Sequence, residues 1–319
     1  MSKEQRKFAD DVWAVWIDGE ELRTVYIHDW VNPKSKSYVD LAVRIRGVKD
    51  CKCLHAYVPF EVSKEEIEDV SLLLDDTKIL HAIFSAACIV DFKKNEHTSE
   101  IAYNGKTIDI VHISTADFNL KPVDKGTLFD IPLEELQPFI DNDEAYFVWR
   151  MPHKSLDVLF KPRVDVGNTL ERFVDLLTTP VISERYGYSI RVNESRLLPD
   201  GITKIGGFHR QKLKKAVINL SIDESYDLND ANCYRIRRME HNLYENYVPN
   251  GYRYEEAIIY QWKQNREHNM RGQFNFYHNI TKESMSKGSL FLYLILLPSI
   301  DVIGNFVADG IYALLEMFK

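Results

Sequence analysis

The sequence predicts an α+β fold, in which a strand-rich region with a few helices is followed by a C-terminal hydrophobic helical segment. Within residues 12–58, runs of β-branched and aromatic residues alternate with turn signals, which is typical of strands. An Asn104-Gly105 pair separates two further runs, and this dipeptide is a strong hairpin signal. Near the C-terminus, Leu290–Leu297 is an unbroken apolar run. Together the three observations indicate that strands come first in the chain and that an apolar helix comes last.

Composition places the strand-rich region in the cytosol. The chain has 319 residues, a net charge of −8 and a mean hydropathy of −0.30, which excludes a polytopic membrane protein. Its four cysteines are sparse, as expected in a reducing compartment. The N-terminal residues are polar and form no apolar stretch of the kind that directs export.

The first half is predicted to begin with a strand meander and to continue with a helix and a hairpin. The meander strands are Val12–Ile17, Thr24–Val31, Tyr38–Arg46 and Cys51–Val58. Ser63 and Glu66 have the spacing of a capping box, which predicts a helix with Ile67, Val70 and Leu74 on one face. Residues 80–90 are expected to be buried core, and the three prolines in 115–143 predict an irregular connection.

The second half is expected to mix strands and helices. Strands are predicted at 145–149, 156–160, 186–192, 215–222 and 273–280, and helices at 169–177 and 253–264. The resulting organisation is a strand-rich α+β domain over 1–117, a connection over 118–143, a second α+β region over 144–280 and a C-terminal segment over 281–319.

The C-terminal segment carries its polar groups on one stripe. The stretch 289–308 is about as long as a helix that crosses a bilayer core. At the helical period, the polar residues fall within about a quarter of the circumference. They are Asp301, Asn305, Asp309, Tyr312 and Glu316. Apolar residues cover the rest of the helix surface. The pattern therefore predicts either a membrane helix with a water-facing stripe or a helix that is buried in a soluble domain and interrupted at Pro298.

If the segment spans a membrane, the flanking charges orient it. Lys282 and Lys287 precede it and only Lys319 follows, which places the bulk of the chain on the cytoplasmic side of the inner membrane. The four residues predicted to line a pore are Asp301, Asn305, Asp309 and Glu316.

No common catalytic signature is present, so the sequence offers no catalytic residue and no cofactor site. The chain lacks a phosphate-binding G-x-x-x-x-G-K-[ST] loop, a G-x-G-x-x-G turn, a G-x-S-x-G elbow and an H-E-x-x-H zinc motif. Cys51, Cys53 and His55 alternate along one strand face, but no second pair completes a four-ligand set. We therefore expect them to be buried side chains without a metal, and we expect a protein that is not an enzyme, although an active site assembled from distant residues stays open.

Basic residues gather in two short segments against this acidic background. The predicted phosphate-binding residues are Arg210, Lys212, Lys214, Lys215, Arg235, Arg237 and Arg238. Tyr186, Tyr188 and Tyr234 are near them in sequence, and cations with aromatic rings are typical of single-strand or oligonucleotide sites. A solvated basic face and a face resting on anionic lipid are the alternatives.

The basic cluster at 209–215 and the tail at 289–318 give a layout that resembles the membrane effectors of bacterial anti-phage defence operons. Within that group the layout is similar to the Hailong-type effector, an oligomeric channel held shut by short single-stranded DNA. The resemblance implies a homo-oligomer in a lipid bilayer, gated by a nucleotide or a single-stranded oligonucleotide. The alternative function is a soluble nucleic-acid-binding protein whose C-terminal helix is an oligomerisation element.

Overall fold

A computed structural model describes twelve segments of the chain and confirms the α+β class. The described residues are 12–19, 21–32, 35–84, 88–91, 95–103, 105–154, 182–208, 213–228, 233–252, 257–265, 273–284 and 287–317. By contacts the chain divides into two compact units. The first unit comprises Met1–Phe160, Tyr188–Glu224 and Asp230–His278, and the second comprises Lys161–Gly187, Ser225–Asn229 and Asn279–Lys319.

Strands dominate the described residues. They are β1 (Val12–Ile17), β2 (Glu21–Trp30), β3 (Tyr38–Arg46), β4 (Cys53–Val58), β5 (Cys88–Asp91), β6 (Thr98–Tyr103), β7 (Lys106–Val111), β8 (Asn119–Val123), β9 (Gly126–Pro132), β10 (Glu144–Pro152), β11 (Ile182–Val192), β12 (Lys215–Asp223), β13 (Tyr226–Leu228), β14 (Arg235–Arg238), β15 (Ala257–Asn265) and β16 (Phe274–Ser284). The helices are α1 (Thr77–Phe84), α4 (Asp200–Thr203), α5 (His241–Tyr244) and α6 (Lys287–Met317). Short 3-10 turns occupy Val48–Asp50, Lys64–Glu66, Ser71–Asp75, Thr115–Asp117 and Gln137–Phe139.

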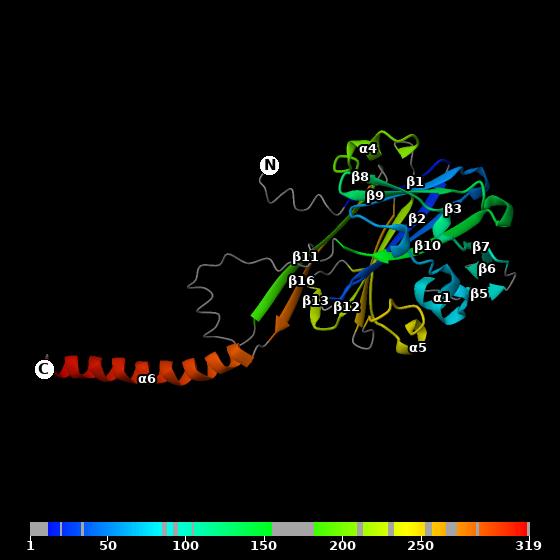
Figure 1. Cartoon of the computed structure of the whole chain (residues 1–319). Coiled ribbons are helices and arrows are strands. Elements are labelled where there is room, and N and C mark those ends of the chain that lie inside the picture. Colours follow the sequence, from blue (N-terminus) through cyan, green and yellow to red (C-terminus); the bar gives the residue numbers. More distant parts are fainter. Residues whose placement is uncertain are drawn as a thin grey trace. The chain divides into compact units, whose positions relative to one another are not determined.

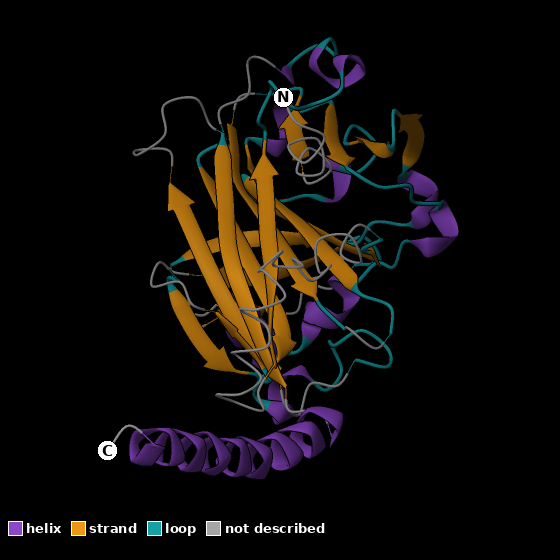
Figure 2. Cartoon of the chain, turned by 90° about the vertical axis from the view of Figure 1, so that its left-hand side faces the viewer, coloured by secondary structure: helices purple, strands orange, loops and turns teal. Residues whose placement is uncertain are grey.

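The strands form two mixed sheets (Figures 1 and 2). One has seven strands in the order β13-β16-β11-β1-β4-β9-β8, and the other has nine in the order β14-β15-β12-β2-β3-β10-β7-β6-β5. Most neighbours are antiparallel, while β1 pairs with β11, β12 with β2 and β10 with β7 in parallel. Parallel neighbours between distant segments explain why the chain order and the spatial order of the strands differ so widely.

The core lies between the inner faces of the two sheets. Trp149 of β10 packs against Phe118 and Phe129, with ring centroids 5.6 and 6.0 Å apart. The buried carboxylate of Asp29 in β2 accepts a 2.5 Å hydrogen bond from the hydroxyl of Tyr188 in β11. Every residue of β1 is buried, because the strand is central in its sheet and covered on both faces.

The described residues cover only part of the outer face of the nine-stranded sheet. Residues of α1 and α5 join a hydrophobic cluster with sheet residues such as Trp30, Val148 and Ile259. Asp40 and Arg150 form a buried ion pair under this cover, with Nε 2.6 Å from Oδ1, and Trp30 donates to the same carboxylate. Toward the other ends of β12, β15 and β3 the residues on this face become polar and more exposed.

Most predicted strands are confirmed, and the Asn104-Gly105 hairpin is confirmed by the pairing of β6 with β7. The meander was wrong in its pairing: β1 pairs with β4 and β2 with β3, so the turn at Asp18-Gly19 leads from one sheet to the other. The residues predicted as a strand at 156–160 and as a helix at 169–177 lie outside the described residues.

Three other element predictions were wrong. The capping box at Ser63 is present but opens only a 3-10 turn, and Ile67 to Leu74 form no α-helix. The expected irregular connection contains β8 and β9. Of the helix predicted at 253–264, the described residues 257–264 belong to strand β15.

Candidate functional site: a cationic sheet face and an exposed apolar helix

Strand pairing brings the two predicted basic segments together. β15 lies between β12, which begins with Lys215, and β14, which contains Arg235, Arg237 and Arg238. A single strand therefore separates segments that are about twenty residues apart in the sequence. The side chains of Arg210 and Lys212 lie outside the described residues.

The register identifies which side chains share a face. Val217 is opposite Lys263, and Asn219 and Arg235 are both opposite Gln261. Cross-strand partners project to the same side of a sheet, as do residues two apart on one strand. Lys215, Lys263 and Arg235 therefore lie on one face.

Arg44 completes this group from β3, because Lys215 is paired with Thr24 and Thr24 with Arg44. We refer to Lys215, Lys263, Arg44 and Arg235 as the cationic face. Lys263 and Arg44 were not among the predicted residues. Lys263 belongs to the segment expected to be a helix, and Arg44 reaches the face only through strand register.

Lys215 holds its charge at a cost. Burial lowers the pKa of Lys215 to about 8, and the neighbouring charges of Lys263 and Arg44 act in the same direction. An anion placed between the two amines would offset both effects, since an opposite charge favours the protonated form. The half-buried Arg44 already has a partner, since its Nε donates a 2.7 Å hydrogen bond to Glu144.

Amide and aromatic groups surround these charges. The side chain of Gln261 donates to Asn219 at 2.9 Å, which leaves further amide donors on the same face. Tyr234 is 63% exposed, and the ammonium of Lys263 lies 5.1 Å from its ring centroid. Cations, amides and an exposed ring are the groups that bind phosphates and stack on bases.

Three of the predicted basic residues have other partners. Arg237 donates to the carbonyl of Ala82 at 2.7 Å and to the Tyr244 hydroxyl, so it holds β14 against α1 and α5. Strand alternation places Arg238 on the opposite face, where it pairs with Glu224 at 2.7 Å. Lys214 is exposed and pairs with Glu21.

The predicted aromatic partners are also divided. Tyr188 is fully buried and Tyr186 is 6% exposed, so neither offers an open ring surface. Of the three tyrosines singled out in the sequence, only Tyr234 is available for stacking.

The C-terminal helix α6 is continuous from Lys287 to Met317 and includes Pro298. Its segment Leu294–Glu316 spans 23 residues with a mean hydropathy of 1.6, and no residue of its most apolar stretch is buried. Phe306, for example, is 74% exposed. The chain thus combines a strand-rich body with one C-terminal helix that is long and apolar enough to anchor in a membrane.

The predicted pore-lining residues lie on this helix. Asn305, Asp309 and Glu316 are exposed, whereas the side chain of Asp301 is outside the described part of α6. Because α6 is helical throughout, spacings of four and seven residues keep Asn305, Asp309, Tyr312 and Glu316 on one stripe.

No family model matches the chain, and no curated protein matches it. The chain is therefore an α+β protein with two distinctive features. One is a C-terminal helix that is long and apolar enough to anchor in a membrane, and the other is the cationic face.

Proposed function

We propose that the protein is a ligand-regulated, homo-oligomeric membrane effector of a bacterial defence system, gated by a nucleotide or short single-stranded oligonucleotide. The bulk of the chain would lie on the cytoplasmic side of the inner membrane. The observation that carries the proposal is the apolar stretch Leu294–Glu316 of α6, which is 23 residues long and has no buried residue in its most apolar part. An exposed apolar surface of this size is stable in water only when lipid or protein covers it.

The polar stripe on α6 favours an assembly over a single anchor. An isolated helix would expose Asp309 and Glu316 to lipid, where a charge at mid-depth costs on the order of 3 kcal/mol. Several copies with their stripes facing one another would give these carboxylates water instead. A ring of carboxylates attracts cations, so the assembly would conduct cations in preference to anions.

The cationic face supplies the regulatory part of the proposal. Lys215 and Lys263 are adjacent like charges, and an anion between them relieves their repulsion. Phosphates fit this requirement, and Tyr234 offers an exposed ring on which a base can stack. A ligand with both groups is a nucleotide or an oligonucleotide.

β15 provides a route by which ligand binding could act on the tail. Lys263 is on one face of β15, and its neighbour Trp262 on the other face stacks on His278 of β16 with centroids 4.2 Å apart. β16 ends at Ser284, and two residues separate it from the start of α6 at Lys287. A shift of β15 on ligand binding would therefore be felt by the strand that leads into α6.

The membrane part is tested by fractionating cells that express the full chain or a chain ending at 286. We expect the full chain in the membrane fraction and the shortened chain in the soluble fraction. Full chain that is soluble and oligomeric without detergent would refute the membrane proposal, and would favour the alternative of a soluble nucleic-acid-binding protein with an oligomerisation helix.

The ligand part is tested by fluorescence anisotropy with short DNA and RNA oligomers. The double variant Lys215→Glu/Lys263→Glu should lose binding, and wild-type binding should fall steeply with salt. Lys154→Glu/Lys204→Glu is the matched control, because it makes the same change in net charge at two exposed lysines that already have carboxylate partners and lie outside the predicted basic segments. Equal losses in both double variants would refute a site on the cationic face.

A further inference from the structure

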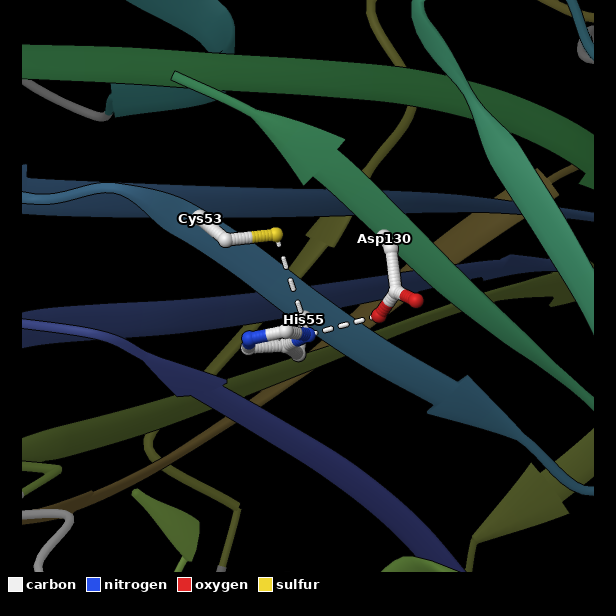
Figure 3. Close-up of side chains that lie close together, drawn as sticks. All are labelled: Cys53, His55 and Asp130. Atoms are coloured by element: carbon white, nitrogen blue, oxygen red, sulfur yellow. Dashed lines mark hydrogen bonds and ion pairs between the residues drawn. The ribbon is translucent and has the colours of Figure 1, made fainter. Parts of the chain in front are cut away.

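A second cluster of chemically active side chains lies in the seven-stranded sheet, apart from the cationic face. Cys53 and His55 are two residues apart on β4, and Asp130 of β9 is the register partner of His55 (Figure 3). The Sγ of Cys53 lies 3.8 Å from the Nδ1 of His55, and the Oδ1 of Asp130 lies 2.6 Å from the same nitrogen. All three donor atoms are within 4.8 Å of one another.

Surrounding residues hold each of these groups in place. The imidazole of His55 is 8% exposed and stacks on Trp16 at a centroid distance of 4.9 Å. Its second nitrogen, Nε2, faces the Oδ2 of Asp18 at 3.4 Å. The outer oxygen of Asp130 pairs with the ammonium of Lys121 at 2.6 Å. The ring therefore has a carboxylate on each side and little freedom to turn.

Cys53, His55 and Asp130 do not have the geometry of a nucleophilic triad. In such a triad the thiol and the carboxylate use different nitrogens of the imidazole, so that a proton can pass through the ring. Here the thiol and Asp130 both approach Nδ1. The Cys53 sulfur, the His55 Nδ1 and the Asp130 oxygen instead lie together as ligands around a cation do. The carboxylate of Asp18 at Nε2 fixes the ring.

We propose that Cys53, His55 and Asp130 bind a divalent transition-metal ion of the zinc type, with Asp18 orienting the imidazole from behind. A thiolate, an imidazole and a carboxylate together favour zinc over magnesium or calcium, which prefer oxygen ligands alone. The three residues fill three positions of a tetrahedron and leave the fourth for water or an outside ligand.

The sulfur and nitrogen atoms are already spaced much as two ligands of one zinc ion are. Ligands about 2.0–2.3 Å from a tetrahedral zinc ion lie roughly 3.3–3.7 Å from one another. The sulfur–nitrogen distance of 3.8 Å is close to this range, whereas the nitrogen–oxygen distance of 2.6 Å must widen as the ion replaces a shared proton. Binding releases the proton of the Cys53 thiol and any proton on Nδ1 to solvent.

The ion would join β4 to β9, which are already paired strands. Asp130 could not be assigned to the cluster from the sequence, because it is 75 residues from His55 and meets it only through the register. The third alternating residue, Cys51, has a different environment: it is fully buried and its thiol donates to the carbonyl of Gly47 at 3.3 Å.

The test is metal titration of the full, untagged chain after treatment with a chelator, using Zn²⁺ for stoichiometry and Co²⁺ for spectroscopy. We expect one equivalent per chain and a thiolate-to-cobalt charge-transfer band in the near ultraviolet. Cys53→Ser should abolish that band, and Asp130→Asn should weaken binding at least about tenfold. Cys233→Ser removes a half-buried thiol that lies just before β14 and is the matched control, with no expected change.

Two milder variants keep the proposal testable if the ligand variants fail to fold. Asp18→Asn should weaken the affinity about tenfold through the imidazole. Lys121→Met should strengthen it, because the competing ammonium on Asp130 is removed. A folded wild-type chain that binds no metal, or binds cobalt without the thiolate band, would overturn the assignment.

Discussion

Replacing Lys215 by Met should stabilise the protein at neutral pH. Lys215 is half-buried, and burial together with the neighbouring Lys263 lowers its pKa from 10.5 to about 8. The folded state therefore holds the charged amine less favourably than the unfolded chain does. Met has a similar length and no charge, so it keeps the packing and removes the unfavourable group.

The pH window and the size of the effect follow from the two pKa values. Below about pH 8 the amine is charged in both states and the full cost applies; between 8 and 10.5 the unfolded chain binds the extra proton, so wild-type stability rises with pH. The difference in pKa sets an upper bound of about 3 kcal/mol. Solvent screening at this partly exposed position reduces the expected gain to about 1 kcal/mol.

The assay is urea unfolding in detergent, followed by tryptophan fluorescence at pH 7 and pH 10. The advantage of Lys215→Met over wild type should be present at pH 7 and shrink by pH 10. Lys214→Met is the control: it loses an exposed ion pair with Glu21, whose contribution is below about 1 kcal/mol. A Lys215→Met chain that is no more stable at pH 7 than at pH 10, relative to wild type, would refute the reasoning.

Other expected outcomes concern the core, a turn and the tail. Arg150→Met should lower the free energy of unfolding by about 3–5 kcal/mol in urea, because it leaves the 3% exposed Asp40 unpaired, and adding Asp40→Asn should recover part of the loss. If the double variant is no better, desolvation of the carboxylate is not the cause. Gly105→Val should cost about 1–2 kcal/mol because Gly105 has φ +74°, while Gly105→Asn should cost less; equal losses would show that the backbone angle is irrelevant. Asp309→Asn should reduce cation selectivity in planar bilayers, and unchanged reversal potentials would remove Asp309 from the conduction path.

Alternation of apolar residues was sufficient to predict most strands. It failed where the helical period and the strand period place the same residues on one face. In the segment that became β15, Ile258 and Trp262 are four residues apart, which fits one face of a helix. Four is also an even number, so the same residues fit one face of a strand. Pairing with β12 on one side and β14 on the other decided between them.

The prolines of the expected connection illustrate a second limit. Pro122 lies in β8, which is the edge strand of its sheet, and Pro132 is the last residue of β9. Both positions tolerate a missing amide donor. Proline frequency alone therefore predicted an irregular segment. Only the order of strands in the sheet shows that these prolines are compatible with strands.

The candidate sites divide in the same way between local and distant information. Clusters close in the sequence, such as Lys214-Lys215 and Arg235 to Arg238, could be found by inspection, but their partners could not. Lys263 and Asp130 join their clusters through register, and Arg237 leaves its cluster because Tyr244 and the Ala82 carbonyl lie within reach. Which side chains come together in a site therefore depends on how the strands pair.

The net charge of the chain affects how an anionic ligand would bind the cationic face. A chain with a net charge of −8 repels anions at long range, so a phosphate ligand would gain little from electrostatic steering. Its binding would depend on short-range contacts with Lys215, Lys263 and Arg235. Lys215 is held there although burial opposes its charge, whereas the preceding residue, Lys214, is exposed and paired with Glu21. An anion bound beside Lys215 would supply an opposite charge and lower this cost.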